Sequence, residues 1–197
     1  MSNLSLFTGL FFSDGHMLRV ISGQFGGRRL FGPRGLQFRP TLDRVKESIF
    51  SVLGEDIVDR NVLDLFCGCG SLGIEALSRG ALSATFIDKN KTAIELTRKN
   101  LIALGLGDRS RVICRDFRDR NDTGLNDQFN LIFSDPPYND YLADIVINML
   151  LTANLLARAG ILVIERSKQE KAAGNENLKK LKNLRFGQTE VDFYFRP

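Results

Sequence analysis

Asp135-Pro136-Pro137-Tyr138 places an acid, two rigid residues and an aromatic ring directly after the apolar run 129–134. Prolines fix their own φ and bias the preceding residue toward extended backbone, so the Asp135 carboxylate and the Pro136 carbonyl can point at one amino group. Tyr138 can stack on the ring that carries this amine. Two acceptors on the amine protons leave its lone pair free to attack a methyl donor. The motif therefore suits methylation of an amino group on a planar base, and the alternative is an ordinary proline turn after a strand.

A second candidate site follows the apolar segment 61–66, where Gly68, Gly70 and Gly73 have the spacing GxGxxG before an amphipathic segment. A strand, a glycine turn and a helix in this order bind nucleotides in many folds. Asp88 lies about 20 residues after the first glycine, where an acid can accept hydrogen bonds from ribose hydroxyls. The pattern by itself fits NAD, a flavin or S-adenosylmethionine, and it also occurs without any ligand.

Charge distinguishes these ligands. Asp64 precedes the glycine loop, and a carboxylate there would repel a pyrophosphate, which prefers bare amide groups at a helix N-terminus. The sulfonium and ammonium groups of S-adenosylmethionine would instead be attracted to it. We therefore expect Asp64 and the loop from Phe66 to Gly70 to hold the methionine half of S-adenosylmethionine, and Asp88 to hold its ribose.

With these residues in place, the chain resembles the RsmD-type bacterial 16S ribosomal RNA guanine-N2 methyltransferases, a family of class I S-adenosylmethionine-dependent enzymes. The resemblance covers nearly everything from Met17 to the end. The glycine loop and the DPPY motif are shared by many methyltransferases. The more selective matches are 18–23, 27–30, 39–50, 64–81 and 185–189. Cys67 and Cys69 stand where small residues such as Ala and Ser are expected, and both are small enough to keep the loop geometry.

The resemblance implies an α/β, Rossmann-like class I methyltransferase fold. Such a fold has a mostly parallel central sheet with helices on both faces and an antiparallel last strand, here preceded by an N-terminal β-hairpin. The resemblance also implies that Asp116, with Phe117 beside it, meets the adenine of the donor. It implies that the methyl group goes to the exocyclic N2 amino group of a specific guanine in 16S ribosomal RNA. The expected catalytic residues are Asp135, Pro136, Pro137 and Tyr138, and the expected cofactor-binding residues are Asp64, Phe66, Gly68, Gly70, Asp88, Asp116 and Phe117.

Other activities share parts of this pattern. Amino methyltransferases acting on adenine N6 or on cytosine in DNA carry DPPY, but they commonly add a target-recognition region, and here the methyltransferase elements use up the chain. Protein-glutamine methyltransferases use a related motif that usually begins with Asn where this chain has Asp135. A non-catalytic RNA-binding ribosome assembly factor could retain the fold, and failure to bind S-adenosylmethionine would indicate it.

Composition indicates one catalytic domain in a reducing compartment. The chain has 197 residues, of which 43% are hydrophobic and 25% charged, which is ordinary for a globular protein with one core. Its three cysteines, two of them in the glycine loop, do not form a disulfide framework. The only histidine is His16, so we expect no metal site. These features predict a cytoplasmic protein.

The first sixteen residues are rich in Leu and Phe but contain no Lys or Arg. They fail the pattern of a signal peptide and are too short to span a bilayer. We interpret residues 1–16 as an appendage before Met17, consistent with an over-called start, and no other segment is a candidate for crossing a membrane.

The net charge of +4 is distributed unevenly. The segment 17–46 has seven basic residues opposed by Asp43 alone, and most of them are arginines, which suit phosphate contacts. Glycines at 23, 26 and 27 between alternating apolar residues predict a β-hairpin. We therefore expect a basic β-hairpin extension at 17–40 and a methyltransferase domain at 41–197. The residues expected to contact substrate RNA are Arg19, Arg28, Arg29 and Arg39.

The expected partner is ribosomal RNA, within a small-subunit particle or assembly intermediate, and the enzyme is expected to be a monomer with no membrane partner. A solvated basic surface without any partner is the alternative for the basic segment.

Periodicity predicts alternating helices and strands along the remainder. The expected helices are 41–53, 90–104 and 142–150, and the expected strands are 61–66, 84–87, 111–115, 129–134, 160–165, 184–186 and 189–195. Asn90 and Gly105 suit the two ends of the second helix. The polar segment 119–128 is expected to be a loop, and 167–182 a mobile or helical connection.

Overall fold

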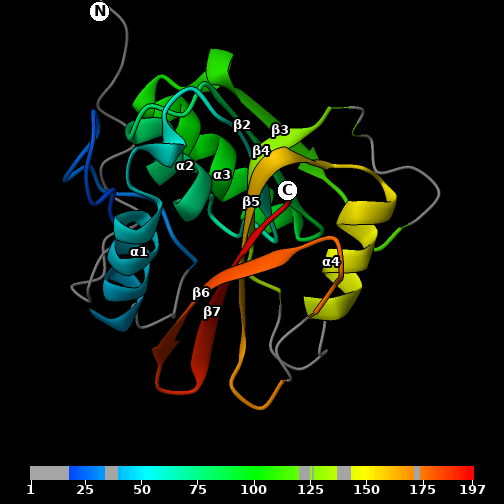
Figure 1. The fold of residues 1–197 in the computed structure, drawn as a ribbon. Coiled ribbons are helices and arrows are strands. Elements are labelled where there is room, and N and C mark those ends of the chain that lie inside the picture. The colour runs from blue at the N-terminus through cyan, green and yellow to red at the C-terminus, as the bar shows by residue number, and fades with distance from the viewer. Residues whose placement is uncertain (1–17, 34–39, 120–124, 126, 137–142, 171–173) are drawn as a thin grey trace, which may run out of the picture.

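The computed structural model describes residues 18–33, 40–119, 125, 127–136, 143–170 and 174–197 (Figure 1). Its centre is a seven-stranded sheet with the order β3-β2-β1-β4-β5-β7-β6. The strands are β1 Asn61–Leu65, β2 Ser83–Asp88, β3 Ser110–Cys114, β4 Phe129–Ser134, β5 Leu156–Ser167, β6 Lys179–Phe186 and β7 Thr189–Phe195. Strands β1 to β5 pair in parallel, and β7 pairs antiparallel with both β5 and β6.

This topology confirms the class I methyltransferase fold. The chain runs from β1 outward to β3, then returns to β4 on the other side of β1, so the strand order reverses between β1 and β4. Ligands of such sheets bind outside the carboxyl ends of the strands at this reversal. Two independent segments, one after β1 and one after β4, are thereby brought next to each other.

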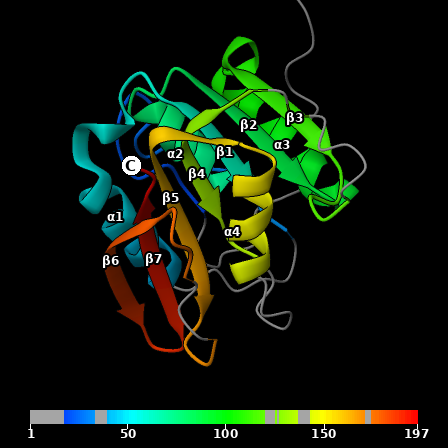
Figure 2. The same cartoon turned by 45° about the vertical axis from the view of Figure 1, so that its right-hand side comes forward.

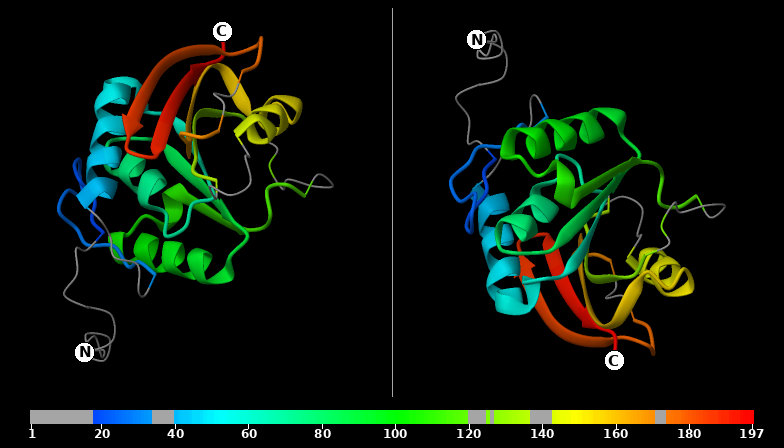
Figure 3. Two further views of the ribbon diagram at one scale, coloured as in Figure 1. Left: turned by 90° about the horizontal axis from the view of Figure 1, so that it is seen from below. Right: turned by 90° about the horizontal axis from the view of Figure 1, so that it is seen from above.

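Helices cover the two faces of the sheet unequally (Figures 2 and 3). The helices are α1 Pro40–Leu53, α2 Ser71–Ser78, α3 Lys91–Leu104 and α4 Ala143–Thr152, with short 3-10 helices η1 Gly54–Ile57 and η2 Gly107–Arg109. Among the described residues, α1, α2 and α3 pack on one face and α4 alone packs on the other. Each helix therefore buries its apolar side against the sheet.

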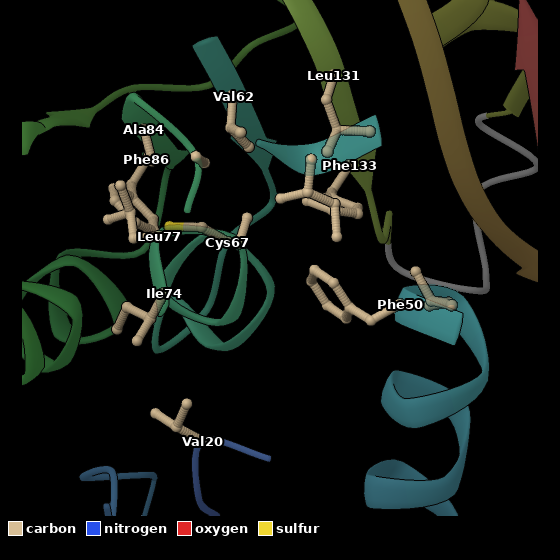
Figure 4. Packing of buried hydrophobic residues seen from close by; sticks show 14 of the residues in the cluster. Val20, Phe50, Val62, Cys67, Ile74, Leu77, Ala84, Phe86, Leu131 and Phe133 are labelled. Carbon is tan, nitrogen blue, oxygen red and sulfur yellow. The ribbon is translucent and has the colours of Figure 1, made fainter. Parts of the chain in front are cut away.

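The buried strands separate two apolar clusters because successive side chains point to opposite faces. Val62 and Phe133 face the three-helix side, where Figure 4 shows them near Phe50 of α1 and Phe86 of β2. The rings of Phe50 and Phe133 lie 5.5 Å apart between centroids, which joins α1 to the middle of the sheet. Ile132, directly before Phe133 in sequence, packs on the α4 side.

Local signals set the limits of α3 as predicted. The Asn90 side chain accepts hydrogen bonds from the backbone N–H groups of Thr92 and Ala93, which begins the helix. Gly105 adopts a left-handed conformation with φ of 67°, which ends it. The start of α3 is thus fixed directly after β2, at the carboxyl end of the sheet.

The predicted N-terminal hairpin is present in a reduced form. Arg19 and Arg29 form an isolated antiparallel bridge, and the backbone N–H of Leu30 donates to the carbonyl of Leu18 at 2.8 Å. Leu18, Val20 and Leu30 are buried in the same cluster as α1, α2 and α3. The described part of this segment therefore packs onto the domain.

One expected connection is partly wrong. The backbone already forms a β-strand from Lys179 onward, whereas the sequence predicted a mobile or helical segment as far as residue 182. Here β6 is the edge strand, and Lys179 pairs with Phe195 of β7. Lysines suit an edge strand because they keep it solvated and oppose pairing with other chains. Because they are polar, this part of the sequence lacks the apolar alternation from which strands are predicted. In the described part of the chain, no helix has the length and apolarity needed to cross a membrane.

Gly73 of α2 lies against the sheet too closely for any side chain. A Cβ atom there would lie 2.4 Å from Cε1 of Phe86 and 3.1 Å from Oδ2 of Asp64. We expect Gly73→Ala to lower the free energy of unfolding by about 1–3 kcal/mol, because the helix or the ring must shift. Urea denaturation followed by circular dichroism measures this.

Gly107→Ala is the matched control, since a Cβ atom added at this glycine would have no neighbour within 4 Å. It should change the unfolding free energy by less than about 0.5 kcal/mol. Equal effects of the two substitutions would contradict the close approach of α2.

Candidate active site at the carboxyl ends of β1 and β4

The two sequence motifs meet at the carboxyl ends of adjacent strands. The glycine loop follows β1, and Asp135 follows β4, whose Ser134 pairs with Leu65 of β1. The backbone N–H of Asp135 lies 3.4 Å from the carbonyl of Leu65 and donates to it. A ligand held by the glycine loop therefore lies next to the start of the DPPY motif.

The glycine loop has an unusual backbone. Phe66, Gly68 and Gly70 have φ values of 57°, 57° and 81°, in the left-handed region. Phe66 carries a side chain there, which is uncommon and often marks a functional turn. A Cβ atom on Gly68 would have no neighbour within 4 Å, so this turn leaves open space where a ligand can approach the backbone.

Asp88, the residue expected to bind the ribose, holds the glycine loop. Its Oδ2 accepts from the backbone N–H of Gly68 at 2.9 Å, and its Oδ1 accepts from that of Asn90 at 2.8 Å. A carboxylate has about four acceptor positions, so two further donors such as ribose hydroxyls can be accommodated. The Asp88 carboxylate is therefore held in position by the protein before any ligand binds.

Asp64 lies beneath the loop and is only 2% exposed. Its Oδ2 accepts from the backbone N–H of Gly73 at 2.8 Å. Burial raises the pKa of Asp64 to about 8, and the nearby charge of Asp88 adds to the rise, while the hydrogen bond from Gly73 opposes it. From the sequence we expected an ionised carboxylate. Ionisation of this carboxyl group is therefore disfavoured in the folded chain, and a cation close to it would favour ionisation.

Asp116 and Phe117 follow β3 but differ in environment. Asp116 forms a salt bridge with Arg118 at 2.8 Å, and this hydrogen bonding lowers the pKa of Asp116 to about 2. Phe117 is 3% exposed and packs in the cluster on the α4 side. The acid is accessible to a ligand, whereas the ring belongs to the core.

Asp135 is exposed at the end of β4, and Pro136 is buried beside it. Although the residue is exposed, protein atoms surround its carboxyl group on the side of the sheet, and this partial desolvation raises the pKa of Asp135 well above its usual range. The carboxylates of Glu165 and Asp64 raise it further. Pro137 and Tyr138 lie outside the described residues. The role of Asp135 and Pro136 as hydrogen-bond acceptors for a substrate amine stays a prediction.

Two polar residues of α3 hold the glycine loop and were not predicted from the sequence. Thr97 donates from Oγ1 to the carbonyl of Gly68 at 2.9 Å, and Asn100 donates from Nδ2 to the carbonyl of Cys69 at 2.9 Å. Both residues are at most 1% exposed. The available signal was their position on the same helical side as the apolar residues Ile94 and Leu101.

The basic N-terminal segment is fixed to α1, α2 and α3. The Glu75 carboxylate of α2 accepts from the backbone N–H groups of Ile21 and Ser22, at 2.7 and 3.0 Å. Lys46 of α1 donates to the carbonyl of Arg19 at 2.5 Å and to Oγ of Ser71, the first residue of α2, at 3.1 Å. This part of the segment therefore lies beside the start of α2 and the glycine loop.

The four expected RNA-contacting arginines do not share one location. Arg19 and Arg29 are brought together by their bridge, and Arg19 also forms an exposed salt bridge with Asp43. Arg28 donates to the carbonyl of Ala103 near the C-terminal end of α3, which lies away from the carboxyl ends of the strands. Arg39 lies outside the described residues. Within the described part of the chain, no group of His, Cys, Asp and Glu side chains could hold a metal ion.

The raised pKa of Asp64 predicts a pH-dependent stability. Its folded pKa of about 8 lies above the ordinary value near 4, so ionisation is costlier in the folded chain, and stability falls as pH rises through this range. Asp64→Asn removes that loss. Relative to the wild type, the ligand-free variant should gain on the order of a few kcal/mol of unfolding free energy between pH 5 and pH 9.

Urea denaturation at several pH values tests this prediction. Asp108→Asn, at an exposed position, should reproduce the pH dependence of the wild type. If the unfolding free energy of Asp64→Asn and of the wild type depends on pH in the same way, ionisation of Asp64 does not lower the stability of the folded chain, and the prediction is wrong.

Comparisons with known proteins agree with this geometry. Ribosomal RNA small subunit methyltransferase D of Escherichia coli strain K12 is 37% identical over 156 residues, covering 78% of this chain and 76% of that protein. The protein of the same name from Haemophilus influenzae is 35% identical over 179 residues, covering 90% and 93%. The solved structure of Escherichia coli YhhF superposes with a TM-score of 0.80 at 31% identity, covering 92% of this chain and 98% of that one.

The sequence profile of one family spans almost all of the described chain. The family is described as "Conserved hypothetical protein 95", and the match runs over residues 18–195. The resemblance to RsmD-type enzymes is thereby confirmed, and the chain belongs to this family of class I methyltransferases.

Proposed function

We propose that this protein transfers a methyl group from S-adenosylmethionine to the exocyclic N2 amino group of a guanine in 16S ribosomal RNA. The observation that carries the proposal is the meeting of the glycine loop after β1 with Asp135 after β4, on paired strands at the order reversal. The glycine loop suits a cationic methyl donor, and the segment at Asp135 suits the amino group that receives the methyl group. Ribosomal RNA methylation follows from the family and from the names of its relatives.

The donor site fits S-adenosylmethionine, which would supply an electrophilic methyl group on a sulfonium ion. Open space at Gly68 admits a ligand to the loop backbone. Asp88 would accept from the ribose hydroxyls, and Asp116 would meet the adenine. Asp64 is too buried for broad contact, so its charge would act on the nearby cation through the protein, where attraction is stronger than in water. Phe66 and Gly70 would shape the loop, and Phe117 would support Asp116 from the core.

The acceptor site would orient the amine. Asp135 and the carbonyl of Pro136 would accept the two amine protons, which directs the nitrogen lone pair toward the donor methyl group. As the nitrogen gains positive charge, the ionised Asp135 stabilises it and can take up a proton. Pro137 would hold this backbone shape, and Tyr138 would stack on the base. A stacked guanine must first be flipped out or already lie in a loop.

The identity of the base rests on the resemblance to RsmD-type enzymes, since the acceptor site would hold any planar amine. We propose guanine N2 in RNA rather than adenine N6 or DNA on the strength of that resemblance. We propose nucleic acid rather than a protein glutamine because the basic N-terminal segment lies beside the donor loop. We further propose that a monomer acts in the cytoplasm on a small-subunit particle or assembly intermediate.

Nucleoside mass spectrometry of small-subunit ribosomal RNA, with and without the gene, tests this proposal. We expect loss of one N2-methylguanine on deletion, and its return when purified enzyme and S-adenosylmethionine are added to particles from the deletion strain. Methyl transfer to adenine N6, DNA or glutamine would refute the substrate. Failure to bind S-adenosylmethionine, or binding of NAD equally well, would refute the enzyme.

Asp135→Ala should lower the single-turnover rate of methyl transfer on the order of a hundredfold or more, because an amine acceptor is lost. Donor affinity measured by calorimetry should stay within about twofold, since the glycine loop is intact. Because the pKa of Asp135 is raised, the wild-type rate should increase with pH well above pH 4. Asp135→Asn keeps an acceptor oxygen and should lose this increase. Unaffected chemistry with lost donor binding would contradict the assignment.

Replacing Arg28 and Arg29 together with Ala should weaken RNA binding at low salt, because phosphate contacts are lost. The log–log slope of affinity against salt should become shallower by about 1–2 units from reduced counterion release. A matched double variant, Arg158→Ala with Lys179→Ala, removes equal charge from exposed positions at the amino end of the sheet. Equal slopes for both variants would show a general charge effect and exclude a specific RNA contact by Arg28 and Arg29.

A further inference from the structure

A buried arginine lies on the α4 side of the sheet, on β5, the strand that pairs with β4. Arg166 of β5 is only 4% exposed. Its Nε donates to Oδ2 of Asp192 at 2.8 Å, and its Nη2 forms a salt bridge with Oε2 of Glu190 at 2.5 Å, both on β7. These two acids neutralise the guanidinium and fix its direction. Its remaining nitrogen, Nη1, is therefore held in one place.

This arginine fixes the turn that follows β5. Nη1 of Arg166 donates to the backbone carbonyls of Ser167 and Glu170. The backbone N–H of Glu170 donates to the carbonyl of Ser167 at 3.0 Å, and that of Lys168 donates to the carbonyl of Gln188 at 2.8 Å. The turn is consequently held to β5 at Glu170 and to the β6–β7 turn at Lys168.

The Glu170 side chain then reaches helix α4. Its Oε1 accepts from the backbone N–H of Ala143, the first residue of the helix, at 2.8 Å, in a buried contact. An acceptor at this position satisfies a free N–H group, and its negative charge is favourable at a helix N-terminus. A second contact joins the same parts of the chain, because the N–H of Gly174 donates to Oδ1 of Asp144 at 3.3 Å.

We propose that Glu170, held by Arg166, is a positioning residue for methyl transfer. This inference rests on the proposed function. Only residues 137–142 separate Pro136 from Ala143, and they include Tyr138. The chain before this connection is fixed by the hydrogen bond from the N–H of Asp135 to the carbonyl of Leu65. The chain after it is fixed by the hydrogen bond from the N–H of Ala143 to Glu170. Loss of the second hydrogen bond would release the first residue of α4, which is the first described residue after the DPPY motif.

The energetics favour a role in orientation. Burying a guanidinium and two carboxylates is expensive, and apolar residues of similar volume often stabilise a fold as well or better. Directed hydrogen bonds instead define one geometry, and a displacement of about 1 Å in a reacting group can cost on the order of a hundredfold in rate. The Arg166 contacts end at the helix that follows the DPPY motif, where such accuracy has a use.

Three substitutions at Glu170 test the inference in a methyl-transfer assay with the RNA substrate. Glu170→Gln keeps the length and the acceptor oxygen, Glu170→Asp keeps the charge but shortens the reach, and Glu170→Ala removes both. We expect kcat to fall about tenfold or more for Ala and Asp and to stay within about threefold for Gln. Donor affinity should stay within about twofold for all three. Glu176→Ala, at an exposed position of the same segment, is the control and should match the wild type.

The outcomes separate this inference from the proposed function. Wild-type kcat for Glu170→Asp, with thermal stability lowered, would show a structural role and overturn the inference. Equal losses in Gln and Asp would also overturn it, because the acceptor would not matter. If Glu170→Ala fails to fold, the comparison of kcat between Glu170→Gln and Glu170→Asp still tests the inference. An inactive wild type that binds donor would instead refute the proposed substrate.

Discussion

The close approach of helix α2 to the sheet at Gly73 is the constraint on which the donor site depends. A side chain there would collide with Phe86, so only glycine lets the helix come near enough for its backbone N–H to reach Asp64. That contact fixes the start of α2 relative to β1. The loop between them is short, and it must turn through left-handed conformations at Phe66, Gly68 and Gly70 to make the connection. The open backbone at Gly68 is a consequence of this packing.

A second buried carboxylate positions the basic segment against the same helix. Glu75 is fully buried and forms salt bridges with Arg79 and Lys46 while accepting two backbone N–H groups from residues 21 and 22. Removing any one donor would leave a buried charge less well compensated, so the arrangement favours a single placement of the segment. Substrate recognition and donor binding, as proposed, would thus share α2 as a common support.

Elements with local signals could be predicted from the sequence, and those set by distant partners could not. Asn90 and Gly105 define the ends of α3 without tertiary information. The ionisation of Asp64 was misjudged because burial depends on α2 packing over it. Arg166 and Asp192 are charged residue types that usually lie on the surface, and they become buried only when β5 pairs with β7. The position of Arg28 beside α3 likewise depends on where the whole segment docks.

The carboxyl groups at the ends of the central strands link the two halves of the proposed reaction. Asp64, Asp135 and Glu165 lie on β1, after β4 and on β5, and the pKa of Asp135 is raised partly by the other two. Without ligand, ionising one carboxyl group makes ionisation of its neighbour less favourable. A cationic donor beside Asp64 would offset this repulsion by stabilising negative charge nearby. Under the proposed function, donor binding would therefore also favour the ionised Asp135 that orients the amine, so the acceptor site becomes competent when the methyl group is present.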